Sequence, residues 1–521
     1  MKKGLTRSVF TFGSWTLVSR VLGLARDVVI GVVFGPSGAT DAFFVAFKIP
    51  NFMRRLFAEG AFAQAFVPVL SEYRSQRPTP DVRRLISHVS GSLGLTLVIL
   101  TVLGIAGAPY LLTVFAPGFV GDPQRSMLAV DMLRLTFPYL LLISLTACAG
   151  AVLNACGSFG PPAFAPVLLN LCMIGAALWV APNLEVGVMA LAGAVLVAGV
   201  LQLLLQLPFV GRQGLLAFPV PRWKDPGVRR ILRLMGPTLF GTSVQQINLL
   251  VDTILASFLV TGSISWLYWS DRLVEFPLGI FGVALGTVIL PRLSTQHAAQ
   301  SPEAFSHTLD WALRLTLVLI LPATVGLAFL AGPLLATLFQ YGAFTADDVL
   351  AASLSLAAYA VGLMGFVLVK VLTPAYFSRQ DTRTPVRCAA VAMVVNMVLS
   401  TSLVLLLLHT GIAHAGIAFA TAMAATVNAT LLLRGLKKQG IYRPEAGWPL
   451  ILRQAGGATL LMGLVLYWPG RHVELWLQSG FALRAVYLAL AIFAGAAVYF
   501  LALLAFGLRP RHFREPPMAR G

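Results

Sequence analysis

Charged residues are scarce in this chain of 521 residues: Asp, Glu, Lys and Arg make up 11% of it, whereas 58% of its residues are hydrophobic. A soluble domain carries about 25% charged residues, so the composition excludes an ordinary soluble protein. Acids are scarcer than bases, with 20 against 38, and the net charge is +18. The mean hydropathy of +0.83 indicates a polytopic membrane protein.

Cysteines and catalytic motifs are also sparse. The four cysteines, Cys148, Cys156, Cys172 and Cys388, lie in or beside apolar segments without the paired spacing of metal ligands, so we expect no disulfide framework. The sequence contains no GxxxxGK[ST], HExxH or GxSxG motif, and its seven histidines do not cluster. We therefore expect neither an ATP-driven motor nor an enzyme.

Long apolar runs recur from one end of the chain to the other. About 20 helical residues cross the hydrocarbon core of a bilayer. The start, MKKGLTRSVFTFGSW, is basic but lacks a cleavage site, so we expect its helix to be retained. Fourteen segments qualify as transmembrane helices: 9–34, 39–72, 85–109, 127–154, 162–181, 186–210, 234–258, 264–291, 306–330, 348–375, 388–408, 412–433, 449–468 and 479–507.

The distribution of positive charge predicts the orientation. If the N-terminus is cytoplasmic, 25 lysines and arginines lie in cytoplasmic segments and only Arg125 and Arg471 lie on the other side. This asymmetry predicts that both termini are cytoplasmic, and it accounts for the net charge without nucleic acid. The basic stretch RWKDPGVRRILRLMGP at 222–237 resembles a helix lying on anionic lipid, but we favour a topology anchor and linker.

Some basic residues lie deep inside the predicted spans. At about 2.5–3.5 kcal/mol each, six lipid-facing charges would cost about 15–20 kcal/mol. That cost matches or exceeds the usual net folding stability of about 5–15 kcal/mol. The charges must therefore face one another or a water-filled cavity within the membrane. The six are Arg20, Arg26, Lys48, Arg54, Arg55 and Arg272.

Helical geometry predicts which charges share a face. At about 100° per residue, the second span carries one stripe, from which Arg54 points away. That stripe contains Asp41, Lys48, Arg55 and Glu59. In the first span, Arg20 aligns with Asp27, while Arg26 lies about 120° away. In the eighth span, Asp271 and Glu275 are four residues apart.

The alternative is that these charges are buried in ion pairs that only set helix register. It stays open for Arg55 with Glu59, and for Asp271, which has Glu275 nearby. Across the whole set, six bases exceed five acids, Asp27, Asp41, Glu59, Asp271 and Glu275. This surplus predicts an anionic ligand, and arginine favours phosphate. A candidate cation site comprises Asp252, Asn396 and Ser400, although a structural role for Asp252 is at least as favoured.

The chain carries a short internal repeat. FVPVLSEY (66–73) and ILPRLSTQ (289–296) each follow a glycine-rich apolar stretch with a proline and a charge cluster. Because six helices separate the two copies, they have the same orientation in the membrane. Such parallel repeats are typical of two lobes with a ligand site between them. We predict lobes at 1–215 and 216–436, followed by an appended helix pair and basic tail at 437–521.

The sequence closely resembles the MurJ (MviN) family of bacterial lipid II flippases. The resemblance covers nearly the whole chain and is carried by these segments: SRVLGLARD, ATDAFFVAFKIPNFMRRLFAEGAFAQAFVPVLSEY, TFPYLLLISLTA, SDRLVEFPLG, GVALGTVILP and YFSRQDTRTP. It implies the fold of the multidrug/oligosaccharidyl-lipid/polysaccharide exporters, with two six-helix lobes around a central cavity and a two-helix hairpin. The hairpin would flank a groove for the polyprenyl tail.

The resemblance also implies the function. Arg20, Arg26, Asp41, Arg54 and Arg272 would occupy the family's required charged positions in the cavity, with Lys48, Arg55, Glu59, Asp271 and Glu275 in cavity or gating roles. The protein would flip lipid II across the bacterial inner membrane by alternating access. Cell-wall synthesis or division proteins are candidate partners. No cofactor is expected, and coupling to sodium, to protons or to the membrane potential alone stays open. Three alternatives are export of another polyprenyl-linked oligosaccharide, drug export and a non-transporting scaffold.

Overall fold

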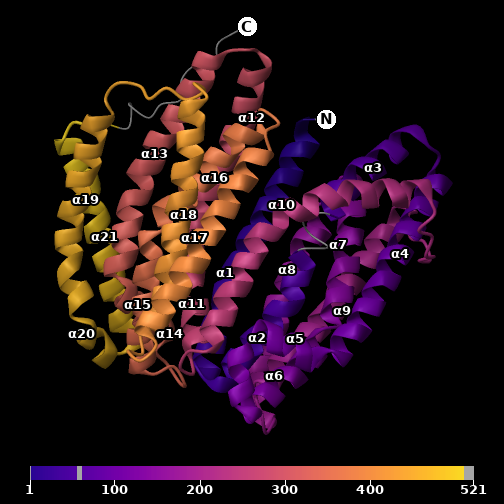
Figure 1. Ribbon diagram of the computed structural model, residues 1–521, viewed down its shortest axis with the longest axis horizontal. Helices are drawn as coiled ribbons and strands as arrows, with labels where there is room; N and C mark the ends of the chain where they lie inside the picture. Colours follow the sequence, from indigo (N-terminus) through magenta and orange to yellow (C-terminus); the bar gives the residue numbers. More distant parts are fainter. Residues whose placement is uncertain (1, 56–61, 510–521) are drawn as a thin grey trace. The chain divides into compact units, whose positions relative to one another are not determined.

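The structure is a computed structural model, and every regular element among its described residues is a helix, as Figure 1 shows. It describes residues 2–55 and 62–509, and for residues 2–13, 237–245 and 283 it describes the backbone alone. The predicted all-α class is therefore confirmed. The chain forms two compact units, Met1–Ser265 and Trp266–Gly521.

The first unit pairs helices that are distant in the sequence. Helix α1 packs on α8, α2 on α6, α7 on α9, and α3 on both α7 and α10. Its helices are α1 (Lys2–Phe34), α2 (Gly38–Arg54), α3 (Ala63–Gln76), α4 (Thr79–Ala106), α5 (Ala108–Phe115), α6 (Pro123–Thr136), α7 (Tyr139–Ala155), α8 (Gly160–Gly175), α9 (Met189–Arg212) and α10 (Pro226–Ser257). Helix α11 (Ser263–Pro277) begins in this unit and continues into the second.

The basic stretch at 222–237 does not form a separate surface helix, because α10 runs continuously from Pro226 to Ser257. Asp225 is the N-cap of α10 and accepts hydrogen bonds from the N–H groups of Gly227 (2.8 Å) and Val228 (3.2 Å). His88 Nδ1 of α4 lies 2.9 Å from the other Asp225 oxygen. Although burial opposes it, this hydrogen bonding holds the pKa of Asp225 below its ordinary value. Residues 226–237 of the basic stretch are thus the start of α10, and the role of the stretch as a topology anchor stays a prediction.

The second unit contains the rest of α11 and the remaining helices. Helix α17 packs along α18, α13 along α16 and α19, and α19 along α21. The helices are α12 (Val283–Ala298), α13 (Pro302–Phe329), α14 (Ala331–Phe339), α15 (Ala346–Val361), α16 (Leu363–Phe377), α17 (Arg383–Leu407), α18 (Ala413–Lys438), α19 (Trp448–Arg471), α20 (Val473–Gln478) and α21 (Phe481–Ala505).

Among the described residues, ten helices are long and apolar enough to cross a membrane, or eleven if the bent pair α15–α16 counts as one span. The pair bends by 40° next to Gly362, where an added Cβ would come within 2.4 Å of Ala422 Cα. The predicted fourteen spans are therefore not confirmed. The other three predicted segments, 9–34, 39–72 and 234–258, each include residues that are not fully described, so the count does not test them.

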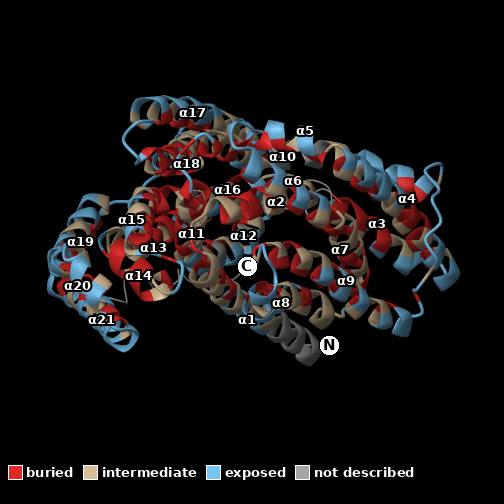
Figure 2. Ribbon diagram, turned by 90° about the horizontal axis from the view of Figure 1, so that it is seen from below, coloured by how far each residue is buried: buried red, intermediate tan, exposed pale blue. Residues whose placement is uncertain are grey.

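Large apolar side chains lie exposed along many helices. Figure 2 shows long stretches of exposed residues on α17 and α19–α21. Leu460, Leu464 and Phe493 are each more than 70% exposed. Such surface belongs against lipid rather than water. This pattern supports the membrane assignment independently of mean hydropathy.

Compactness divides the chain at Ser265, whereas the repeat in the sequence predicts a lobe boundary at residue 215. The two criteria differ because α10 packs on α3 and α4 of the first unit. The repeat itself has a local counterpart, since α3 contains Pro68 and α12 contains Pro291 at matching places. The predicted lobe boundaries stay predictions.

Candidate functional site

Two helices of the first unit fix one of the predicted arginines. The Arg26 guanidinium of α1 donates to Asp27 Oδ1 from Nη2 (2.6 Å) and Nε (2.9 Å), and to Asn170 Oδ1 of α8 from Nη1 (3.1 Å). Asn170 in turn donates to the Ser19 carbonyl (3.0 Å). Arg26 is 8% exposed and Asp27 is 2% exposed. Arg26 is therefore held in place by a neutralising pair, which the sequence did not predict.

Arg20 has a different environment from Arg26. It is exposed, and within the described part of the chain no carboxylate pairs with it. Gly23, between them, faces α8, since a Cβ there would lie 3.8 Å from Asn170 Nδ2. The two arginines thus lie on different sides of α1, as helical geometry predicts. Arg20 is the one whose guanidinium is accessible in this structure.

Arg54 is the last residue of α2. Its Nε donates to Asn51 Oδ1 (3.1 Å), and its side chain is half-buried. The buried Tyr139 at the start of α7 lies within electrostatic range of both Arg54 and Arg26. The structure therefore brings two predicted arginines around one tyrosine hydroxyl. Sequence analysis did not identify Tyr139.

Two charged residues of the predicted stripe on the second span lie in different surroundings. Lys48 is half-buried and donates from Nζ to Thr253 Oγ1 of α10 (3.2 Å). Arg55 is exposed at the C-cap of α2. Glu59 lies outside the described residues, so the predicted pair of Arg55 with Glu59 stays a prediction.

Asp41 occupies a sealed position rather than an open one. The side chain is 0% exposed, and its Oδ2 accepts from Arg125 Nη2 (2.6 Å) and from the Gly262 N–H (2.8 Å). Its Oδ1 accepts from the Ser265 N–H (2.9 Å) and hydroxyl (2.5 Å). Asp41 thus caps the start of α11. In this conformation both oxygens of Asp41 accept hydrogen bonds from the protein, and the role in the cavity that the resemblance implies for Asp41 stays a prediction.

Arg125 is the partner that sequence analysis treated only as an external charge. It is 8% exposed and lies over the Phe119 ring, 3.9 Å from the ring centroid. A buried arginine paired with a buried aspartate is strongly destabilised when either partner is removed. Asp41 and Arg125 are therefore interdependent.

In the second unit, α11 carries the charge cluster that the sequence predicted. Glu275 pairs with Arg272, with Oε2 and Nη1 2.5 Å apart, three residues along the helix. Opposite charges three residues apart on a helix attract one another, so this pair follows from their spacing, and the predicted cavity or gating roles of Asp271 and Glu275 stay predictions. The Arg272 side chain is 31% exposed and lies over the Tyr268 ring, while Asp271 is half-buried. Arg272 is thus accessible but already paired.

The three residues predicted for a cation site lie on α10 and α17. Asp252 is half-buried on α10, whereas Asn396 and Ser400 are fully buried on α17, with Ser400 Oγ 3.4 Å from Asn396 Oδ1. Among the described residues, no three His, Cys, Asp or Glu side chains gather where they could hold a metal ion. The predicted set of one carboxylate, one amide and one hydroxyl is of a different kind, so the cation site stays a prediction.

Glutamines of α9 add polar groups to the first unit. Gln202 and Gln206 are each 1% exposed, and Gln202 donates to the Ala165 carbonyl of α8 (2.8 Å). Within the described structure, the Oε1 atoms of both glutamines have no hydrogen-bond partner. Tyr139 lies beside Gln202. The interior of this unit therefore contains buried polar groups as well as buried charges.

Comparison with known proteins gives consistent matches over the whole chain. A sequence model of the family described as "Lipid II flippase MurJ" matches residues 30–488. A "Probable lipid II flippase MurJ" of Vibrio cholerae serotype O1 is 46% identical over 518 residues, covering 98% of this chain and 97% of that relative. A "Lipid II flippase MurJ" of Burkholderia cenocepacia is 42% identical over 517 residues, covering 98% and 99%.

Solved structures agree with these relatives. One described as "Lipid II flippase MurJ, inward closed conformation" aligns with a TM-score of 0.80 and 27% identity, covering 95% of this chain and 98% of that chain. An inward-facing multidrug resistance MATE family transporter of the MOP superfamily aligns with a TM-score of 0.66 and 14% identity, covering 83% and 98%. At that identity, the second match shows a shared fold alone.

Proposed function

The chain belongs to the MurJ family of lipid II flippases, and from this premise we propose that it flips lipid II from the cytoplasmic to the periplasmic leaflet of the bacterial inner membrane. The observation that carries the proposal is the family match over residues 30–488, which includes the charged spans discussed above except the first, since Arg20, Arg26 and Asp27 precede residue 30. Lipid II is an anionic polyprenyl diphosphate glycolipid that crosses the membrane chemically unchanged. The protein therefore acts as a transporter and not as an enzyme.

We propose that arginines recognise the diphosphate. Arg20 and Arg272 are accessible, and each guanidinium offers paired N–H donors that match phosphate oxygens. Arg26 is aimed by Asp27 and Asn170, so an arriving phosphate competes with Asp27 for a guanidinium that is already oriented. Arg54 lies near the same tyrosine as Arg26 and adds positive charge. The polyprenyl tail stays in lipid.

Alternating access then carries the headgroup across the membrane. Movement of the start of α11 would break the hydrogen bonds that Gly262 and Ser265 donate to Asp41. We therefore assign Asp41 to gating rather than to substrate binding. Lys48, Arg55 and Glu59 keep their proposed cavity or gating roles, as do Asp271 and Glu275 of α11.

The membrane potential supplies the driving force in this proposal. An anionic headgroup that leaves an inside-negative cell gains about 2.3 kcal/mol per charge per 100 mV, and an empty positive cavity is drawn back inward. Basic residues outnumber acidic ones inside the predicted spans, and this positive charge favours the membrane potential as the driving force. The cytoplasmic location of both termini, predicted from 25 basic residues against two, belongs to the same proposal.

Removing sodium while holding the potential is expected to leave transport in vesicles unchanged. The measurement is the flipping rate of labelled lipid II in potassium-only buffer with a valinomycin potential, for wild type and Asp252→Ala. If both sodium removal and Asp252→Ala abolish transport, then Asp252, Asn396 and Ser400 hold a coupling sodium ion and the potential alone is insufficient.

Exposure of lipid II in cells tests the proposed function. Cells depleted of this protein should show less lipid II accessible to a periplasmic probe, and wild type should restore it while Arg272→Ala should not. Full rescue by Arg272→Ala removes the proposed role of that arginine. Normal exposure in depleted cells favours a scaffold, and contacts with cell-wall or division proteins would then carry the function. An exporter of another polyprenyl-linked oligosaccharide would leave lipid II exposure unchanged.

A further inference from the structure

The last two long helices are attached to the second unit along their length. Helix α19 packs along α13, and α21 packs along α19 and contacts α13 and α14. Near the middle, the buried Tyr499 hydroxyl of α21 donates to the Val318 carbonyl of α13 (2.6 Å). The segment α19–α21 is called the hairpin here. Each of its two ends is attached through a buried charged residue.

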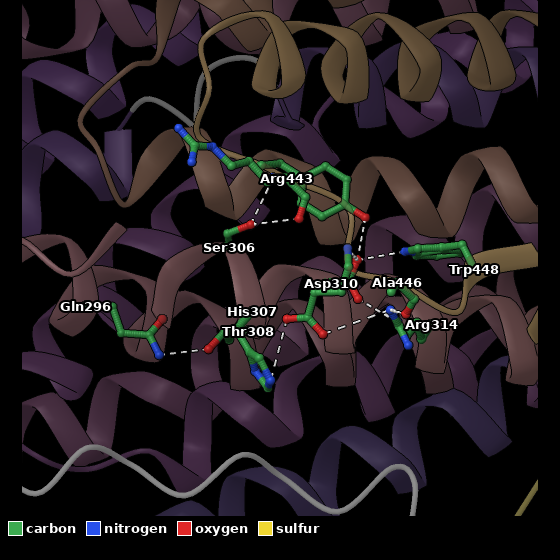
Figure 3. A network of polar contacts seen from close by, with 11 residues as sticks. Gln296, Ser306, His307, Thr308, Asp310, Arg314, Arg443, Ala446 and Trp448 are labelled. Carbon is green, nitrogen blue, oxygen red and sulfur yellow. Dashed lines mark hydrogen bonds and ion pairs between the residues drawn. The ribbon is translucent and has the colours of Figure 1, made fainter. Parts of the chain in front are cut away.

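The first attachment, the loop clamp, is centred on Asp310 of α13, which is 0% exposed (Figure 3). Its Oδ1 accepts from Tyr442 (2.7 Å) and Trp448 (2.7 Å), which lie in or next to the loop that leads into α19. Its Oδ2 accepts from Arg314 Nε (2.5 Å), and Arg314 Nη2 also donates to the Ala446 carbonyl (2.9 Å). If the loop moved away from α13, the Asp310 carboxylate would lose the hydrogen bonds from Tyr442 and Trp448.

Further hydrogen bonds extend the loop clamp. Ser306 Oγ of α13 donates to the Arg443 carbonyl (3.1 Å) and lies 2.9 Å from the Arg443 N–H. Burial and the neighbouring Asp310 raise the pKa of Tyr442, so its hydroxyl remains a donor. The start of α19 is thus fixed to α13 by side chains from both segments.

The second attachment, the turn clamp, is centred on Arg484 of α21, which is 5% exposed. Its Nη1 donates to the carbonyls of Ala336 (2.9 Å) and Gln340 (3.2 Å) at the end of α14, and its Nη2 donates to the Leu477 carbonyl of α20 (3.0 Å). No carboxylate pairs with Arg484 in the part of the chain that the structure describes. The guanidinium is balanced by the negative end of α14 instead.

Both clamps join a buried charge on one helix to partners on another segment. A displacement of the hairpin relative to α13 and α14 by one helical turn, about 5.4 Å, would separate either charge from its partners. Sliding of one packed helix along another is a common motion in transport proteins, and here it would break these buried contacts. We propose that the hairpin and α13–α14 move as one rigid body during transport, with Asp310 and Arg484 as the positioning residues that hold them together.

This inference rests on the proposed function only where lipid II flipping is measured. A disulfide between the hairpin and α14 tests the rigid body directly. A Cβ added at Gly332 of α14 lies 3.5 Å from Val473 Cβ of α20, within the range of about 3.5–4.5 Å for a disulfide. The Gly332→Cys/Val473→Cys pair, in a background in which serine replaces the four native cysteines, locks the turn end of the hairpin when oxidised. Oxidation is expected to leave the lipid II flipping rate unchanged. Loss of flipping on oxidation, reversed by dithiothreitol, would overturn the inference.

Rescue tests the role of Arg484. In the double-cysteine background, Arg484→Met should lower the flipping rate at least fivefold under reducing conditions, and oxidation should restore it, because the disulfide holds the same contact. If Arg484 served only during folding, oxidation of the folded protein would not restore the flipping rate. Leu483→Met, at an exposed neighbouring residue, is the matched control and should keep the wild-type rate. An unchanged rate in Arg484→Met, or no recovery on oxidation, would show that Arg484 does not act through the hairpin.

Disulfide yield separates this inference from the proposed function. With the clamp intact, crosslinking by copper phenanthroline should reach completion equally with and without lipid II, and Arg484→Lys should lower the yield without abolishing folding. A yield that depends on lipid II would mean that the hairpin moves on α14 and would overturn the rigid body. If wild type flips no lipid II, the proposed function fails, while the yields still decide whether the clamp holds.

Discussion

The Asp41→Ala variant is expected to lose about 3–5 kcal/mol of unfolding free energy, because it leaves the Arg125 guanidinium buried without its carboxylate. The same change removes the acceptor for the Gly262 and Ser265 N–H groups at the start of α11. Unfolding in mixed micelles with a rising fraction of SDS, followed by circular dichroism, measures the loss. We also expect transport to fall, since α11 carries Arg272.

A double-mutant cycle supplies the control. In Asp41→Ala/Arg125→Met no charge stays buried, so most of the lost stability should return. Arg134→Met is the matched single change, because Arg134 pairs with Asp131 at the surface (3.6 Å) and should cost about 0–1 kcal/mol. Additive losses at Asp41 and Arg125 would contradict the interdependence that their 2.6 Å contact indicates.

Substitution of the accessible arginine of α1 is expected to weaken substrate binding. Arg20→Gln should raise the dissociation constant for lipid II about 10- to 100-fold, which corresponds to about 1.5–3 kcal/mol for a lost charged hydrogen bond. Arg20→Lys should lose less, because it keeps the charge but not the paired donors. Titration of the purified protein in nanodiscs with fluorescent lipid II measures the constants.

The control for this binding experiment is Arg134→Gln, which removes an in-span arginine that already has its own acid. It should bind lipid II like wild type. Equal weakening by Arg20→Gln and Arg134→Gln would mean that net positive charge, and not a placed guanidinium, governs affinity. Unchanged binding in Arg20→Gln would remove Arg20 from the site.

The sequence predicted the features that depend only on residues near one another in the chain. Composition and run length predicted an all-helical membrane protein, and the cost of charge in lipid singled out Arg20, Arg54 and Arg272 before any fold was known. Helical periodicity predicted that Arg20 and Arg26 face different ways, as they do. These features need only neighbours within a few turns.

Partners distant in the sequence could not be predicted in this way. Asp41 and Arg125 are 84 residues apart, and Arg26 and Asn170 are 144 apart. No periodicity links such positions, so Asp41 resembled a cavity-lining acid until its contacts were known. The loop clamp around Asp310 could not be predicted for the same reason, because the donors Tyr442 and Trp448 lie more than 130 residues further along the chain.

Flipping of fluorescent lipid II in vesicles that contain only this protein tests the central claim most directly. With an inside-negative potential, reduction of the outward-facing dye should reveal transport by wild type, and the Arg20→Gln/Arg272→Gln variant should retain less than a tenth of that rate. The matched variant Arg20→Lys/Arg272→Lys should fall between them. Equal rates in wild type and the glutamine variant would contradict the claim that arginines within the membrane bind the diphosphate.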